Sequence, residues 1–356
     1  MHFEKGRIPQ GYIRYTGRKQ ACLLSGAVLA GVLFILSIAT GPVRVPLDEV
    51  LKTIFFGGGS DRWRIIIFNI RLPQSTAAVV CGAGLAVAGA VMQTILRNPL
   101  GSPFTLGISN AAAFGAALAV ITVGTGVMRS TGADVLTVTN PYITTVSAFV
   151  FSLGASFVIL LISRVKKASP EVMVLAGVTL GSLFTAGTML LQYFSDDVQL
   201  AAMVFWTFGD LSRAGWRETG VISLVVLPVF VYFYINRWNY NAMNGGDETA
   251  KGLGVSVERV RLLGMTAASL VTAVIISFTG IISFVGLVCP HIIRRLTGDD
   301  HRFLLPGSVI AGAVLLLGAD TAARTVLAPS VLPVAVLTSF LGAPVFMWLL
   351  VRGYRQ

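Results

Sequence analysis

The sequence predicts an all-α, polytopic membrane protein with about ten transmembrane helices. Apolar segments recur along the whole chain, hydrophobic residues make up 54% of the 356 residues, and charged residues make up only 12%. A helix needs about 20 mainly apolar residues to cross the hydrocarbon core. Lipid offers no partner to an unpaired backbone N–H or C=O, so each span must be helical. About a quarter of a soluble domain is charged, so no large water-soluble domain is expected.

Ten segments are candidate spans. Nine reach or approach the required length: 21–40, 73–96, 104–123, 142–164, 172–194, 219–236, 260–279, 305–323 and 333–351. A tenth, 281–296, is shorter and is interrupted by Pro290. The first span is longer than the apolar core of a signal peptide and no A-x-A site follows it, so we expect it to be retained. The sequence thus predicts a cytoplasmic N-terminal segment (1–20) and a single transmembrane domain (21–356).

The basic residues sort by side of the membrane. The net charge is +11, which suggests nucleic-acid binding only if the cations share one soluble face. With the N-terminus placed in the cytoplasm and ten alternating spans, two-thirds of the 27 Lys and Arg residues fall on the inner side. This bias is typical of membrane topology. It predicts that both termini are cytoplasmic and argues against a nucleic-acid partner.

Catalytic and metal-binding motifs are missing. A phosphate-binding loop requires a Gly-Lys dipeptide, and the chain has none, so it is not expected to hydrolyse ATP; nucleophile-elbow and H-E-x-x-H motifs are also lacking. The cysteines Cys22, Cys81 and Cys289 have no paired spacing. Cys289 and His291 lack a third ligand nearby. The sequence therefore predicts no catalytic site, metal site or cofactor on this chain.

Two patterns inside the spans predict helix packing. Gly82, Ala86 and Ala90 recur every four residues, which favours close approach of a second helix. Asp320 and Arg324 lie four residues apart on one helix face and are expected to pair. Other acidic residues lie in loops or at span ends. A proton-driven carrier would need more acids within the spans.

The longest inner connection, 237–261, has its own local structure. Asn244, Gly245 and Gly246 predict a turn, and Asp247 is a plausible N-cap for a short helix over 248–251. Gly252 and Gly254 then end that helix. A short capped helix in the cytoplasm has the shape to fit a groove on a soluble partner.

Several blocks of the sequence resemble one transporter family. They are GLAVAGAVMQTILRNPLGSPFTLG within 71–115, FTGIISFVGLVCPHIIRRLTGDDHRFLLPGS (278–308) and LPVAVLTSFLGAPVFMWLL (332–350). They occur in the order found in the FecCD-type permeases, which belong to type II ATP-binding-cassette importers of iron–siderophores, haem and vitamin B12. The resemblance implies a homodimer of ten-helix permeases in the prokaryotic cytoplasmic membrane. It also implies two ATPase subunits that carry ATP and Mg²⁺, and an extracytoplasmic substrate-binding protein.

The resemblance also implies roles for individual residues. In the family, the loop between the sixth and seventh spans inserts into the ATPase, and the matching residues are Glu248, Ala250, Leu253 and Gly254. Outer arginines meet acidic residues of the binding protein, and the matching residues are Arg71 and Arg324. Gln74 and Val331 replace an arginine and a glutamate that the family often has there.

The family closes its cytoplasmic exit with the loops after the second and fourth spans. The matching residues here are Asn98, Leu100, Pro170 and Glu171. The fifth and tenth spans line the pathway, with Thr179, Thr185 and Thr338 on the corresponding faces. No residue selects among the possible cargoes. The alternative is a self-sufficient, ion-coupled secondary transporter, against which the 237–261 loop and the scarcity of acids within the spans both argue.

Overall fold

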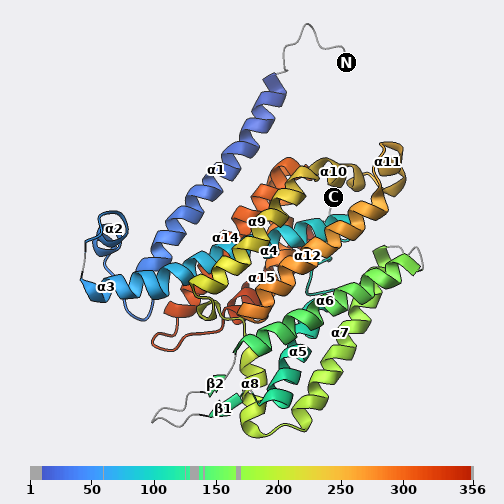
Figure 1. The fold of residues 1–356 in the computed structure, drawn as a ribbon. Helices are drawn as coiled ribbons and strands as arrows, with labels where there is room; N and C mark the ends of the chain where they lie inside the picture. The colour runs from blue at the N-terminus through green and yellow to red at the C-terminus, as the bar shows by residue number, and fades with distance from the viewer. Residues whose placement is uncertain are drawn as a thin grey trace.

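The computed structural model describes residues 10–58, 60–124, 126–128, 136–138, 141–165 and 170–353. Within these ranges the chain is a bundle of helices (Figure 1). Residues 1–9 of the expected N-terminal segment lie outside the described chain. The first helix already begins at Gln10, so it covers much of that segment as well as the first span.

Ten helices correspond one to one with the expected spans. Their bounds are α1 (Gln10–Ala39), α4 (Leu72–Ile95), α5 (Ile108–Val123), α6 (Pro141–Val165), α7 (Pro170–Tyr193), α9 (Trp216–Ile235), α12 (Val257–Thr279), α13 (Val285–Thr297), α14 (His301–Thr325) and α15 (Val334–Gly353). Seven continuous helices of the described chain are long and apolar enough to cross a membrane, α4 being continuous with the helix before it. Helices α5 and α13 are shorter, and the apolar stretch described in α15 runs over Val334–Trp348. The prediction of an all-helical polytopic fold is confirmed.

Smaller elements lie between these helices. They are α2 (Leu47–Phe55), α3 (Asp61–Ile65), a π-helix (Ile66–Arg71), α8 (Asp197–Thr207), a 3-10 turn (Leu211–Arg213), α10 (Arg237–Asn244) and α11 (Asp247–Gly252). Two three-residue strands, β1 (Gly126–Met128) and β2 (Leu136–Val138), pair antiparallel. The sequence predicted neither these strands nor α8. Helix α8 has eleven residues, which are too few to span a bilayer, so the search for apolar spans in the sequence could not find it.

Helix α4 occupies the centre of the bundle. It packs against α14, α12, α13 and α9. In its most apolar stretch 83% is buried inside the protein, compared with 11% in the corresponding stretches of α1 and α7. The predicted stripe of small residues is confirmed, because Gly82 and Ala86 lie directly against Gly312 of α14. A Cβ at Gly82 would overlap the carbonyl of Gly312. Only glycine therefore permits this crossing, and van der Waals packing of the two backbones holds it.

Helices α5, α6 and α7 form a second group beside the central one (Figure 1). Phe114, Phe151 and Phe184 join them, with ring centroids 5.1–6.3 Å apart in edge or tilted geometry. Helix α12 connects the two groups through contacts with α6. The outer side of α7 carries exposed apolar side chains, Leu175, Leu183 and Met189 among them.

The π-helix directly precedes α4. A π-turn leaves backbone groups without their usual partners and often marks a functional position. Here the carbonyl of Phe68 accepts a hydrogen bond from Nε1 of Trp216 at 2.7 Å. The π-helix ends at Arg71, which is one of the predicted docking residues.

Candidate functional site

The segment 237–261 lies at one end of the bundle and contains α10, α11 and the start of α12 (Figure 1). The sequence predicted the short second helix but not α10. The prediction that Asp247 is its N-cap is wrong, because α11 includes Asp247 and the capping position is Gly246, with φ +103°. Only glycine adopts this φ readily. The Asp247 carboxylate is therefore free for another partner, Arg261 at 2.8 Å.

The four predicted coupling residues differ in their surroundings. Ala250 is fully buried, while Leu253 is 70% exposed at the turn after α11. Glu248 is exposed and pairs with Lys251 at 3.0 Å. The hydrogen bond and the charge of Glu248 raise the pKa of Lys251. Gly254 has φ +84° and open space around its Cα. A buried alanine thus anchors α11, and a large apolar side chain projects from its end.

The predicted gate residues lie in the turn after α4 and in the first turn of α7. The Asn98 side chain accepts a hydrogen bond from the backbone N–H of Leu100 at 2.8 Å, which fixes the turn after α4. Leu100 is 42% exposed. Pro170 is buried at the start of α7, and Glu171 follows it with an exposed side chain.

A cavity of about 610 Å³ lies between the first turn of α7 and the coupling segment. Pro170 and Met173 line it from α7, and Asp247, Lys251 and Arg261 line it from the other side. Asn98 and Leu100, both in the described chain, are not among its lining residues. The structure therefore places Pro170 on this cavity with the coupling segment. The first gate loop meets that segment at another point, because a Cβ at Gly246 would lie 3.9 Å from Nη2 of Arg97, the residue before Asn98.

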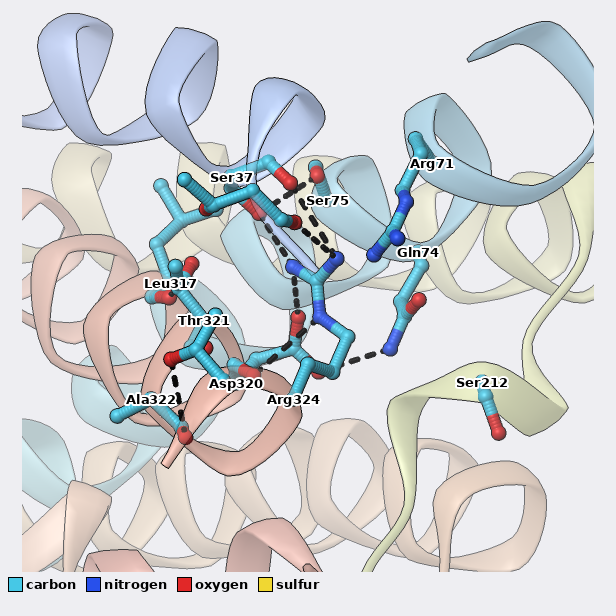
Figure 2. A network of polar contacts seen from close by, with 12 residues as sticks. Ser37, Arg71, Gln74, Ser75, Ser212, Leu317, Asp320, Thr321, Ala322 and Arg324 are labelled. Atoms are coloured by element: carbon cyan, nitrogen blue, oxygen red, sulfur yellow. Dashed lines mark hydrogen bonds and ion pairs between the residues drawn. The ribbon is translucent and has the colours of Figure 1, made fainter. Parts of the chain in front are cut away.

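At the opposite end of α4, Arg71 and Arg324 line a second cavity of about 500 Å³. Both are nearly buried, with 5% and 3% of their surface exposed. The expected pair is confirmed, since Nη2 of Arg324 lies 2.7 Å from Oδ2 of Asp320. Figure 2 shows the Arg324 guanidinium enclosed by Asp320 and by Ser37 of α1, whose hydroxyl accepts at 2.7 Å. Arg324 thus holds α14 to α1.

Arg71 has fewer partners than Arg324. Its Nη2 donates to the Val43 carbonyl at 3.3 Å, and its buried Nε has no hydrogen-bond partner. Gln74 points toward Asp320 (Figure 2), and its amide nitrogen donates to Oδ1 at 3.0 Å. Gln74 therefore gives the Asp320 carboxylate a second partner besides Arg324.

Sequence reasoning missed a third arginine at this cavity, Arg213. It follows α8 in the 3-10 turn and donates to the carbonyls of Phe205 and Trp206 at 2.6 and 3.2 Å. Burial lowers the pKa of Arg213, and the charge of Asp210 opposes that shift. The turn that carries Arg213 has no periodic signal, so only the structure shows that it lies beside Arg71 and Arg324.

The three predicted pathway threonines have different environments. Thr185 lines a groove of about 410 Å³ between α5 and α7 and accepts a hydrogen bond from the Asn110 amide at 2.9 Å. Thr179 is exposed on α7, and Thr338 is buried in α15. Among the described residues, no group of three or more His, Cys, Asp or Glu side chains could hold a metal ion.

Comparisons with known proteins agree on one family. The model of the FecCD transport family matches residues 29–352. The chain is 53% identical to a protein of Methanocaldococcus jannaschii provisionally named as an ABC transporter permease, over 98% of this chain and 99% of that one. It is 38% identical to the hemin transport system permease of Yersinia pestis (96% and 99% covered). It is 34% identical to the vitamin B12 import system permease of Vibrio vulnificus (92% and 93% covered).

The fold agrees with this assignment. A solved structure described as an inward-facing metal-chelate type ABC transporter, itself provisionally assigned, superposes with a TM-score of 0.78 at 28% identity. The match covers 94% of this chain and 99% of that one. The apolar helices, the order of the motifs and the near-complete coverage point the same way. The chain belongs to the FecCD transport family and is a multi-pass membrane permease of the ABC importer type.

Proposed function

We propose that this chain moves a metal chelate or corrinoid (an iron–siderophore, haem or a cobalamin) inward across the prokaryotic cytoplasmic membrane. In this proposal it works as a homodimer, with two separate ATPase subunits that bind ATP and Mg²⁺ and an extracytoplasmic binding protein. Two relatives are named as permeases for hemin and vitamin B12, and these names suggest the substrate class. Both termini lie in the cytoplasm in this arrangement.

The observation that carries the proposal is the projecting end of α11. Leu253 is 70% exposed, while Ala250, three residues earlier, is fully buried. An exposed leucine on a short anchored helix suits insertion into a hydrophobic groove of a partner. Contact with an ATPase would bury Leu253, and rigid-body motion of that partner would then displace α11.

The cavity at the other end of the molecule supports docking of the binding protein. Arg71, Arg213 and Arg324 line it, together with one acidic residue, Asp210. With Arg324 paired to Asp320, the three arginines still outnumber these two carboxylates. The remaining positive charge attracts acidic side chains and orients an approaching partner. Because Arg71 and Arg324 are nearly buried, an acidic side chain of the binding protein would have to reach into the cavity to meet them.

The gate and the pathway complete the proposal. Asn98 and Leu100 would close the cytoplasmic exit from the turn after α4, and Pro170 and Glu171 from the start of α7. Pro170 lines the same cavity as Asp247 and Lys251, so motion of α11 has a short route to the start of α7. The exposed apolar side of α7 offers a surface for the second permease copy.

Reconstitution in proteoliposomes tests this function. The permease is combined with its ATPase and binding protein, and uptake of a ferric siderophore, haem and cobalamin is measured with ATP inside the vesicles. We expect uptake of one cargo class that requires all three components. An ATPase whose phosphate-binding lysine is replaced serves as the control and abolishes uptake.

The same vesicles test the alternative, an ion-coupled secondary carrier. Asp320 is the buried acid within the described spans, and its pairing with Arg324 leaves it unsuited to relay protons. Uptake by the permease alone under a proton or sodium gradient, without the ATPase, would overturn the proposed function.

A further inference from the structure

A second polar cluster lies at the coupling end of the bundle, and no part of the proposed function uses it. It is centred on His301, the first residue of α14, which is fully buried although it is polar. No motif in the sequence assigns His301 a role. A buried polar side chain is costly unless it is hydrogen-bonded, so the partners of His301 specify how these helices meet.

The first side of the cluster joins His301 to α10. Oδ1 of Asn241 lies 2.8 Å from both the backbone nitrogen and Nδ1 of His301. The Asn241 amide nitrogen donates to Asp300 at 3.1 Å, so its oxygen faces the imidazole and accepts from both nitrogens. The ring of Tyr240, also on α10 and fully buried, lies 5.7 Å from that of His301. Helix α10 is therefore held to the start of α14 by polar and aromatic contacts.

The second side joins His301 to α4. Nε2 of His301 lies 2.9 Å from Oγ1 of Thr94 in the last turn of α4. Because Nδ1 carries the proton that Asn241 accepts, Nε2 of a neutral ring is an acceptor that faces the Thr94 hydroxyl. That hydroxyl also lies 3.0 Å from the Ala90 carbonyl, so the two acceptors share its one proton. Arg294 of α13 also donates to Thr94 Oγ1, at 3.3 Å. Asn241, His301 and Thr94 thus form one hydrogen-bonded chain from α10 to α4.

A parallel contact joins α11 to the same turn of α4. Arg261 is 8% exposed and donates through Nε to the carbonyl of Ile95 at 3.0 Å. Its Nη2 bonds both carboxylate oxygens of Asp247, at 2.9 and 2.8 Å. Helix α10, through His301, and helix α11, through Arg261, are therefore each linked to residues 94–95, directly before the first gate loop.

We propose that this junction transmits motion of the coupling segment to the gate loop after α4, with Asn241, His301 and Thr94 as positioning residues. The inference rests on the proposed function, because it assumes that an ATPase moves α10 and α11. The cavity at Pro170 does not include Asn98 or Leu100. The junction supplies a hydrogen-bonded link to the last turn of α4, directly before that first gate loop. Packed elements joined by buried polar bonds move as a unit.

The main test measures cargo uptake per ATP hydrolysed in the reconstituted transporter. Thr94→Val and Asn241→Leu each remove one hydrogen bond of the series Asn241–His301–Thr94. Each is expected to lower uptake per ATP at least about threefold, with the ATPase still bound. In the double variant, uptake per ATP is expected to fall no further than in the more affected single variant, because both changes interrupt the same series of hydrogen bonds. Thr272→Val is the matched control: Thr272 is equally buried but bonds only the carbonyl of Ala268 in its own helix.

Two results would overturn the inference. One is uptake per ATP in Thr94→Val equal to that in Thr272→Val; the other is multiplied losses in the double variant, which indicate two independent structural defects. Wild-type transporter that shows no ATP-driven uptake contradicts the proposed function instead. In that case hydrogen exchange of the purified chain tests the junction alone, since Thr94→Val but not Thr272→Val is expected to speed exchange in residues 237–252.

Discussion

Arg261 and Asp247 are joined by a contact in which a single nitrogen, Nη2, lies within 2.9 Å of both carboxylate oxygens. Arg261 is at the start of α12, and Asp247 begins α11. The 9% exposure of the arginine side chain and the 28% exposure of the aspartate place the pair at the edge of the bundle. The pair fixes the angle at which the coupling segment leaves α12.

Replacing Arg261 with methionine is expected to loosen α11 without unfolding the bundle. The change leaves Asp247 without its cation, and loss of one partner of a half-buried pair costs roughly 1–3 kcal/mol. Limited proteolysis and hydrogen exchange over 245–256 measure the effect. The double variant Arg261→Met/Asp247→Asn removes the stranded charge and should recover part of the protection. Unchanged exchange in Arg261→Met would contradict this role.

Leu253→Glu is expected to abolish ATP-driven uptake while the chain still folds. The side chain packs on little of its own chain, so the substitution costs little stability, but it puts a charge into the proposed ATPase contact. Co-purification of the ATPase and thermal unfolding of the permease separate the two effects. Retained ATPase binding in this variant would argue against Leu253 as the contact.

Gly254→Ala tests the backbone at the same turn. Its φ of +84° costs a non-glycine residue roughly 1–2 kcal/mol, so this variant should distort the end of α11. Gly252→Ala is the matched control, because Gly252 is helical and has open space around it. Equal coupling in the two variants would show that the turn does not depend on glycine.

Asp320→Ala is expected to destabilise the protein by about 3–5 kcal/mol, because it leaves Arg324 buried without its carboxylate. Removing both charges with Asp320→Leu/Arg324→Met should cost less than the single change. Thermal unfolding in detergent, followed by tryptophan fluorescence, measures both. The exposed pair Lys52–Asp48 provides a comparison, since Lys52→Ala should cost less than about 1 kcal/mol. Equal losses at the two sites would disprove the structural role of the buried pair.

Gly82→Leu is expected to prevent assembly of the bundle, because the side chain would enter the backbone of α14 at Gly312. Gly220→Ala is the control, since nothing lies within 4 Å of a Cβ at that position. Membrane insertion followed by size-exclusion chromatography in detergent distinguishes the two. A monodisperse Gly82→Leu protein would mean that α4 and α14 can separate without loss of the fold.

Asp300 makes stability depend on acid pH. Burial raises the pKa of its carboxyl, but hydrogen bonds from Arg302 and Asn241 outweigh burial and bring that pKa from 3.8 to about 2. A lowered folded-state pKa stabilises the protein above pH 3.8, and this contribution is lost as the pH falls toward 2. Asp300→Asn should therefore flatten the unfolding temperature between pH 4 and pH 2.

The sequence predicted the parts of the fold that depend on composition and spacing. All ten spans are helical, and Gly82 and Ala86 pack where their spacing required. The sequence could not predict that Asp247 bonds Arg261 and that Gly246 takes the capping position. A helix capped by Asp247 and a helix that begins with Asp247 fit the same local pattern. Nor could it show that His301 meets Asn241 and Thr94, since those three residues are brought together only by the packing of three helices.

The candidate sites were predictable to different degrees. The coupling segment has a local sequence pattern, so its position and its short helix followed from the chain. Arg213 lies in an irregular turn and joins Arg71 only through tertiary structure. The sequence likewise could not predict that Arg71 and Arg324 are buried, because the groups that contact them come from α1 and from the loop after it.

The wide turn at Ile66–Arg71 sets the direction in which the residues before it face relative to α4. A π-helix holds one more residue per hydrogen-bonded turn than an α-helix, and one residue corresponds to a rotation of about 100° around the axis. Deleting a single residue here would let the segment relax into a regular helix. The residues before the deletion would then turn away from their present neighbours, and Trp216 would lose the Phe68 carbonyl. Insertions and deletions within these six residues should thus be tolerated far less than substitutions at their outward-facing side chains.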